Sequence, residues 1–153
     1  MGYTSKDLDV FILQRDKDRL KGTAYFELHP GELPEPHACW LPGSAFVRDA
    51  AFDFLVVCFE RANPGFDYFS FERFGGEHLD RLVVELVDFA NSLTVGCSRE
   101  TVFSKYNSIF EKDVWTQVDT ELLRAAVARI AEEVTEFSRN SRLESSCLWV
   151  LGM

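Results

Sequence analysis

Runs of apolar and β-branched residues separated by turn signals predict several strands in this chain. Two such runs, Leu8–Gln14 and Gly22–Leu28, flank a charged segment at residues 15–21, and they predict a β-hairpin with a solvated loop. The aromatic stretch Phe66–Phe74 lies between Asn-Pro-Gly and Gly-Gly turn signals and predicts a further strand. Rings fall on both of its faces, so we expect cover on both sides or one face left open for a partner. The apolar run Ser146–Leu151 predicts a last, central strand.

Apolar residues at three- and four-residue spacing predict helices in the remaining segments. The stripe is cleanest over Glu77–Leu93, and Asp119 or Thr120 begins a longer helix that runs to about Asn140. A shorter helix is predicted from Ser98 to near Glu111. We also predict a helix over Ser44–Ala62, although its apolar residues lie nearly all round, a pattern that fits a buried strand equally well.

This order of elements predicts an α+β fold: a mostly antiparallel sheet of about four strands, with four helices packed on one face. The length of 153 residues fits a single domain over residues 1–153. No apolar run approaches the length that spans a bilayer, and no signal-peptide pattern follows the first residues. The four cysteines are scattered without a C-x-x-C pair, so we expect reduced thiols and a cytoplasmic protein.

Four of the five prolines fall within residues 29–43, which therefore form an irregular, stiff loop. Loops of this length are often functional, and this one carries His29, His37, Cys39 and Trp40. The spacing of the two histidines and the cysteine matches no zinc arrangement, so we predict no metal and no cofactor. The chain has neither a G-x-S-x-G elbow nor a Cys-His signature, and we predict no catalytic residue, although a Cys39 thiolate activated by His37 remains an alternative.

Charge narrows the class of partner. The formal net charge is −9, and residues 44–97 hold four basic and nine acidic side chains. Such a chain repels phosphate backbones and anionic lipid, so nucleic acid and membrane surfaces are excluded as partners. Carboxylates that alternate with rings suit a basic protein, because the charges steer the encounter and the rings anchor it. The predicted binding residues are Asp67, Tyr68, Phe69, Glu72, Glu77, Asp80, Trp40 and His37.

We therefore predict a small acidic cytoplasmic protein-binding module without catalytic activity, which neutralises a basic partner as immunity or antitoxin proteins do. That comparison is by type, and no family motif supports it. One alternative is a small-molecule-binding protein or small enzyme with a pocket under the loop at residues 29–43, facing Tyr68 or His78. A second alternative is a homo-oligomeric structural subunit, and a homodimer would fit it.

Overall fold

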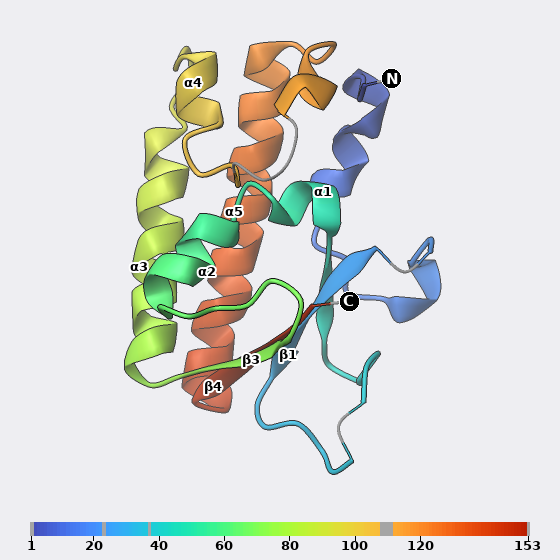
Figure 1. The fold of residues 1–153 in the computed structure, drawn as a ribbon, viewed down its shortest axis with the longest axis vertical. Coiled ribbons are helices and arrows are strands. Elements are labelled where there is room, and N and C mark those ends of the chain that lie inside the picture. The colour runs from blue at the N-terminus through green and yellow to red at the C-terminus, as the bar shows by residue number, and fades with distance from the viewer. Residues whose placement is uncertain (1, 23, 37, 108–111, 153) are drawn as a thin grey trace.

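The computed structural model describes residues 2–22, 24–36, 38–107 and 112–152, and its centre is a four-stranded antiparallel sheet (Figure 1). The strand order is β2-β1-β4-β3. The strands are β1 (Tyr25–Pro30), β2 (Ala45–Arg48), β3 (Phe71–Gly75) and β4 (Cys147–Leu151). The C-terminal strand β4 lies between β1 and β3, as predicted, and the α+β class is confirmed.

Helices cover one face of the sheet. The α-helices are α1 (Asp49–Phe52), α2 (Val56–Ala62), α3 (Glu77–Ser92), α4 (Arg99–Val102) and α5 (Thr120–Glu144), and the 3-10 helices are η1 (Ser5–Phe11), η2 (Lys17–Arg19) and η3 (Lys112–Trp115). The two long helices α3 and α5 run side by side (Figure 1). None of the helices in the described ranges is long and apolar enough to cross a bilayer.

Alternation along the strands gives the sheet two different faces. The residues that point toward the helices are buried and apolar, namely Phe26, Leu28, Ala45, Val47, Phe74, Leu148 and Val150. They pack against rings such as Phe52, whose centroid lies 4.0 Å from that of Phe26, and Phe59, which lies 5.5 Å from Phe74. The other face, here called the outer face, carries Glu27, His29, Trp149 and Arg73 in neighbouring register positions. The loop after β1 contacts this face, because the backbone N–H groups of Trp40 and Leu41 donate hydrogen bonds to Glu27.

The predicted N-terminal hairpin is wrong in its first half, because residues 5–11 form the 3-10 helix η1. Thr4 and Asp7 form a capping box. The Asp7 carboxylate accepts a hydrogen bond from the Thr4 backbone N–H, and the Thr4 hydroxyl accepts one from the Asp7 backbone N–H. The Arg129 guanidinium donates to the carbonyl of Phe11 at 3.4 Å, and Phe11 is fully buried. Local capping and burial thus override the strand propensity of Leu8–Gln14. Within the described part of this segment, Gln14 forms the one β-bridge, to Phe46, and the second predicted strand starts at Tyr25.

The predicted helix at residues 44–62 is also wrong at its start, because Ala45–Arg48 form β2. The remainder is helical but broken at residues 53–55 into α1 and α2. Phe46, which lies off the helical stripe, is the residue that explains the error. As a strand residue it points to the outer face, where its ring stacks on Trp40 at 5.4 Å between centroids.

Three further boundaries differ from the prediction. The strand predicted from Phe66 begins only at Phe71, and residues 66–70 form turns. The helix predicted from Ser98 ends at Val102, and residues 108–111 lie outside the described part of the chain. The helix predicted to end near Asn140 continues to Glu144. The helix predicted over Glu77–Leu93 is confirmed to within one residue.

Candidate functional site

The strand β3 forms an edge of the sheet at which no further strand is found among the described residues. At the opposite edge, Gln14 pairs with Phe46 of β2 through two backbone hydrogen bonds, at 2.9 and 2.8 Å. Within the described ranges, β3 pairs with β4 alone. An unpaired edge strand presents a row of backbone donors and acceptors, which is a surface where another chain can pair.

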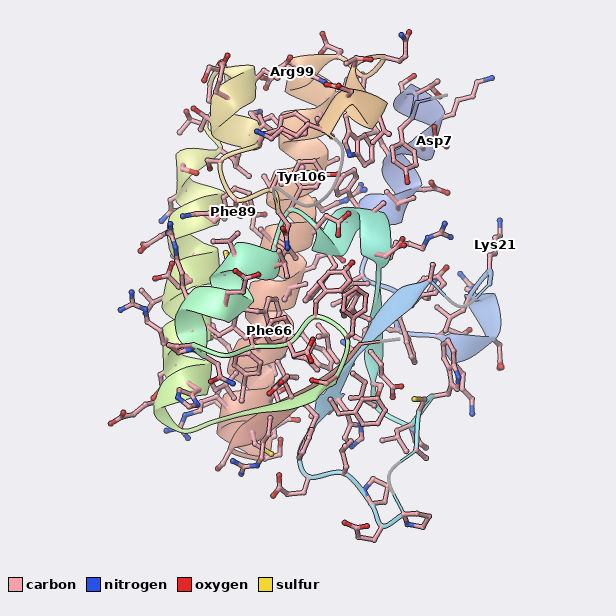
Figure 2. The ribbon with its side chains drawn as sticks, viewed as in Figure 1. Asp7, Lys21, Phe66, Phe89, Arg99 and Tyr106 are labelled. Carbon is pink, nitrogen blue, oxygen red and sulfur yellow. The ribbon has the colours of Figure 1, made fainter. Side chains whose placement is uncertain are left out.

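The turns before β3 fix which rings point inward. Tyr68 donates its hydroxyl hydrogen bond to Asp53 Oδ1 at 3.0 Å, and its ring contacts Phe26 edge-on at 4.6 Å. Phe66 also points inward, against Phe59 and Phe74 (Figure 2). The backbone N–H of Phe69 donates to Asp67 Oδ1 at 2.9 Å, a short turn that leaves the Phe69 ring outside.

Two phenylalanine side chains are exposed here: Phe71 at the start of β3, and Phe69 in the turn before it, where its ring contacts Tyr68 at 4.9 Å. Phe69 is 72% exposed and Phe71 is 36% exposed. Phe71 lies opposite Leu151 on the outer face. Large apolar side chains that are exposed together often mark a binding surface. We define the open-edge surface as Asp67, Phe69, Phe71, Glu72 and Glu77.

Carboxylates lie on the same segment of the chain as these rings. Asp67 and Glu77 are exposed, and half-buried Glu72 accepts hydrogen bonds from the Ser70 hydroxyl at 3.0 Å and the Asp67 backbone N–H at 3.3 Å. The predicted binding residue Asp80 also lies on α3, but its carboxylate pairs with Arg142 at 2.8 Å. Its charge is therefore partly neutralised within the chain.

The cation nearest in sequence to these carboxylates is also paired. Arg73 lies on the outer face, and its Nε donates to Glu32 Oε1 at 2.7 Å. The same oxygen accepts from Cys147 Sγ at 3.1 Å and from Trp149 Nε1 at 3.2 Å. The hydrogen bonds from Arg73, Cys147 and Trp149 lower the pKa of Glu32 to about 2. The pairing of Arg73 with Glu32 leaves the open-edge surface with a negative balance.

Beneath the turn, Asp53 is a buried carboxyl group with an unusual pKa. Burial raises the pKa of Asp53 to about 7, and the hydrogen bond from Tyr68 opposes that rise. Burial and the Asp53 carboxyl group in turn raise the pKa of Tyr68. The pair anchors the turn that presents Phe69, and neither group is solvent-facing enough to act on a partner directly.

Trp40, also a predicted binding residue, lies elsewhere. It sits over β2 on the outer face, and its backbone N–H and that of Leu41 donate to the buried Glu27 carboxylate at 2.6 and 2.8 Å. The Ser44 hydroxyl donates to the same carboxylate at 2.7 Å, and His29 Nδ1 lies 2.9 Å from that hydroxyl. Glu27 therefore holds the loop after β1 against the sheet.

Among the described residues, this cluster shows no activated nucleophile. The Ser44 hydroxyl donates its hydrogen bond to the Glu27 carboxylate. In an activated serine the hydroxyl donates instead to an imidazole base. Burial raises the pKa of Cys39, and burial followed by Glu32 raises that of Cys147 to about 11, so both thiols stay protonated at neutral pH. Among the described residues, no three His, Cys, Asp or Glu side chains form a metal-binding group.

Hollows near the loop are shallow. One of about 230 Å³ is lined by Arg15–Asp18, Leu41–Ser44 and Phe46. Its volume is below the usual range for small-molecule sites, and neither His29 nor Cys39 lines it. A hollow of about 510 Å³ lies between η1 and the Tyr25 end of β1, and none of the predicted binding residues lines it.

The structure thus brings together part of the predicted site. Asp67, Phe69, Glu72 and Glu77 lie on β3 or on the segments directly before and after it, and Tyr68 supports the preceding turn from within. Asp80 lies one turn further along α3 and is paired with Arg142, and Trp40 lies over β2. His37 lies outside the described residues. Phe71 was not among the predicted binding residues, although the alternation within Phe66–Phe74 places it on the face opposite buried Phe74. Comparisons with family models, curated proteins and solved structures found no match.

Proposed function

We propose that this chain is an acidic protein-binding module without catalytic activity, and that the open-edge surface holds a basic protein partner. The observation that carries the proposal is an unpaired edge strand with two exposed phenylalanine rings beside it. In this proposal the complex neutralises the partner, as immunity or antitoxin proteins do. The protein would act in the cytoplasm, where its four free thiols remain reduced.

The rings supply the anchoring energy. Burying a phenylalanine side chain contributes about 1.5–3 kcal/mol. Phe69 is 72% exposed, so binding a partner could still bury most of its side chain. Phe71 is 36% exposed, so binding could bury a smaller part of its side chain. Interfaces concentrate their binding energy in such aromatic anchors.

The carboxylates select the sign of the partner's charge. Asp67, Glu72 and Glu77 lie on the same segment of the chain as the rings, and the net charge of −9 extends the negative field beyond the surface. Opposite charge on a partner accelerates association, and like charge suppresses it. This favours a basic protein over an acidic one.

The alternatives have less support. The shallow hollow beside the loop and the protonated Cys39 thiol argue against a small-molecule enzyme there. A homo-oligomer built on this surface would bring the same three carboxylates of two copies together.

The experiment is affinity capture from the native host, comparing wild type with the double variant F69S/F71S. The matched control is V95S/L122S, which removes two exposed apolar side chains, at 81% and 49% exposure, beyond the far end of α3. We expect one basic protein to be retained by wild type and the control, and to be lost in F69S/F71S. Its purified form should bind F69S/F71S at least about tenfold more weakly.

Two results would overturn the proposal. One is a wild-type chain that retains no basic protein. The other is a retained protein that binds F69S/F71S as tightly as wild type, because the open-edge surface would then take no part in binding.

A further inference from the structure

Half of the backbone groups of β3 point away from the sheet. The Gly152 N–H donates to the Ser70 carbonyl at 3.2 Å, in register with the β3–β4 ladder. Bonded pairs recur at every second residue of an antiparallel ladder. Glu72 and Phe74 therefore turn their N–H and C=O groups toward β4, whereas Phe71 and Arg73 turn theirs toward the open edge.

These outward groups are unused within the described part of the chain. No hydrogen bond from another described residue reaches the backbone of Phe71 or Arg73. The corresponding outward residue at the other edge, Phe46, exchanges both of its backbone bonds with Gln14. The edge at β2 is thus paired at one of its two outward residues, Phe46 but not Arg48, whereas the edge at β3 has no such pairing among the described residues.

We propose that the partner presents an extended basic segment that adds to β3 as a fifth strand and pairs with the backbones of Phe71 and Arg73. This inference rests on the proposed function and specifies how the partner is held. Strand addition gives affinity through main-chain hydrogen bonds and specificity through alternate side chains.

The register determines which side chains the segment carries. A residue opposite Phe71 projects onto the outer face beside that exposed ring, so it is apolar or aromatic. The next residue lies opposite Glu72 and projects to the other face, so it is lysine or arginine. Asp67 and Glu77 lie just beyond the two ends of β3 and favour further basic residues there.

Charge argues against a second copy of this chain as the added strand. The self-pairing that uses both Phe71 and Arg73 places Glu72 directly opposite its own copy. Like charges directly opposite each other in a sheet are destabilising. A basic segment turns the same contact into an attraction.

The test compares Arg73→Pro with Arg73→Ala. Both variants lose the guanidinium, but only R73P loses the N–H that points to the open edge, and the β3–β4 ladder does not use that N–H. The probe is a fluorescent, end-capped heptapeptide in which lysine alternates with valine and phenylalanine, titrated at low salt. We expect R73P to bind it at least about fivefold more weakly than R73A does.

A second measurement does not depend on how R73P folds. In wild type, amide hydrogen exchange of Phe71 and Arg73 should be fast in the free protein and slow when the peptide is bound. Exchange at Glu72, already bonded to β4, should change much less.

The outcomes separate this inference from the proposed function. If R73P and R73A bind alike and the Phe71 and Arg73 amides stay unprotected, strand addition is wrong, while loss of binding in F69S/F71S would still support the surface. If wild type does not bind the peptide saturably, strand addition by an alternating basic segment is also wrong. A dimer of wild type that R73P abolishes would replace the basic segment by a second copy.

Discussion

The buried carboxyl group of Asp53 makes the stability of this protein depend on pH. Its pKa is about 7 in the folded state because of burial, compared with 3.8 for the unperturbed group. Between these values the folded chain holds a proton that the unfolded chain has released, so the free energy of unfolding falls as pH rises from about 4 to 7. Above pH 7 this contribution is constant. The separation of about 3 between the two pKa values corresponds to about 4 kcal/mol.

Asp53→Asn tests this reasoning because it removes the charge and keeps an acceptor for the Tyr68 hydroxyl. The new amide N–H₂ group is buried, and leaving it unpaired costs about 1 kcal/mol or more. We therefore expect D53N to be more stable than wild type by about 3 kcal/mol at pH 8, and no more stable near pH 4. The measurement is urea unfolding across this pH range, followed by the fluorescence of buried Trp115.

The control is Asp88→Asn, which neutralises an exposed carboxylate on α3. It should leave the slope of unfolding free energy against pH unchanged. The reasoning is refuted if D53N has the slope of wild type, or if D53N is the less stable protein at pH 8.

Three further predictions concern other parts of the fold. Glu27→Ala should lower the free energy of unfolding by about 2–4 kcal/mol, because two backbone N–H groups and a hydroxyl lose their acceptor. A decrease below about 0.5 kcal/mol, measured by denaturant titration, would contradict this. Burial raises the pKa of Cys58 to about 12, so iodoacetamide at pH 8 should alkylate Cys58 far more slowly than half-buried Cys97. Mass spectrometry can follow both reactions, and equal rates would be inconsistent with the fold. Gly152→Ala should lower the melting temperature, because the new Cβ would overlap the Tyr68 carbonyl. The free energy of unfolding should fall by about 1–3 kcal/mol. An unchanged melting temperature would show that the two backbones do not approach this closely.

Much of the fold could be predicted where periodicity was clear over a long stretch. The Glu77 and Thr120 helices carry an apolar stripe with polar residues opposite, and both occur at nearly the predicted positions. The apolar run that forms β4 was correctly placed at the centre of the sheet, because a strand flanked on both sides has little room for polar side chains.

The errors occurred where short segments depend on distant partners. Leu8–Gln14 has the composition of a strand, yet Thr4 capping and the bond from Arg129 to Phe11 favour a 3-10 helix. Ala45–Arg48 is followed in the sequence by helical residues, yet it pairs with β1 as a strand of the sheet. In short elements local propensity is weak, so tertiary contacts decide the outcome.

The sequence by itself determined the composition of the candidate site: an acidic, aromatic stretch bounded by turn signals, without a recognisable catalytic motif. Only the tertiary structure decided which rings are exposed. Phe69 and Phe71 are exposed because β3 lies at the end of the strand order and Asp67 turns the chain before it, whereas Phe66 and Phe74 are covered by α2. Strand order arises from contacts between segments far apart in the chain, and residue spacing within one segment carries no record of them.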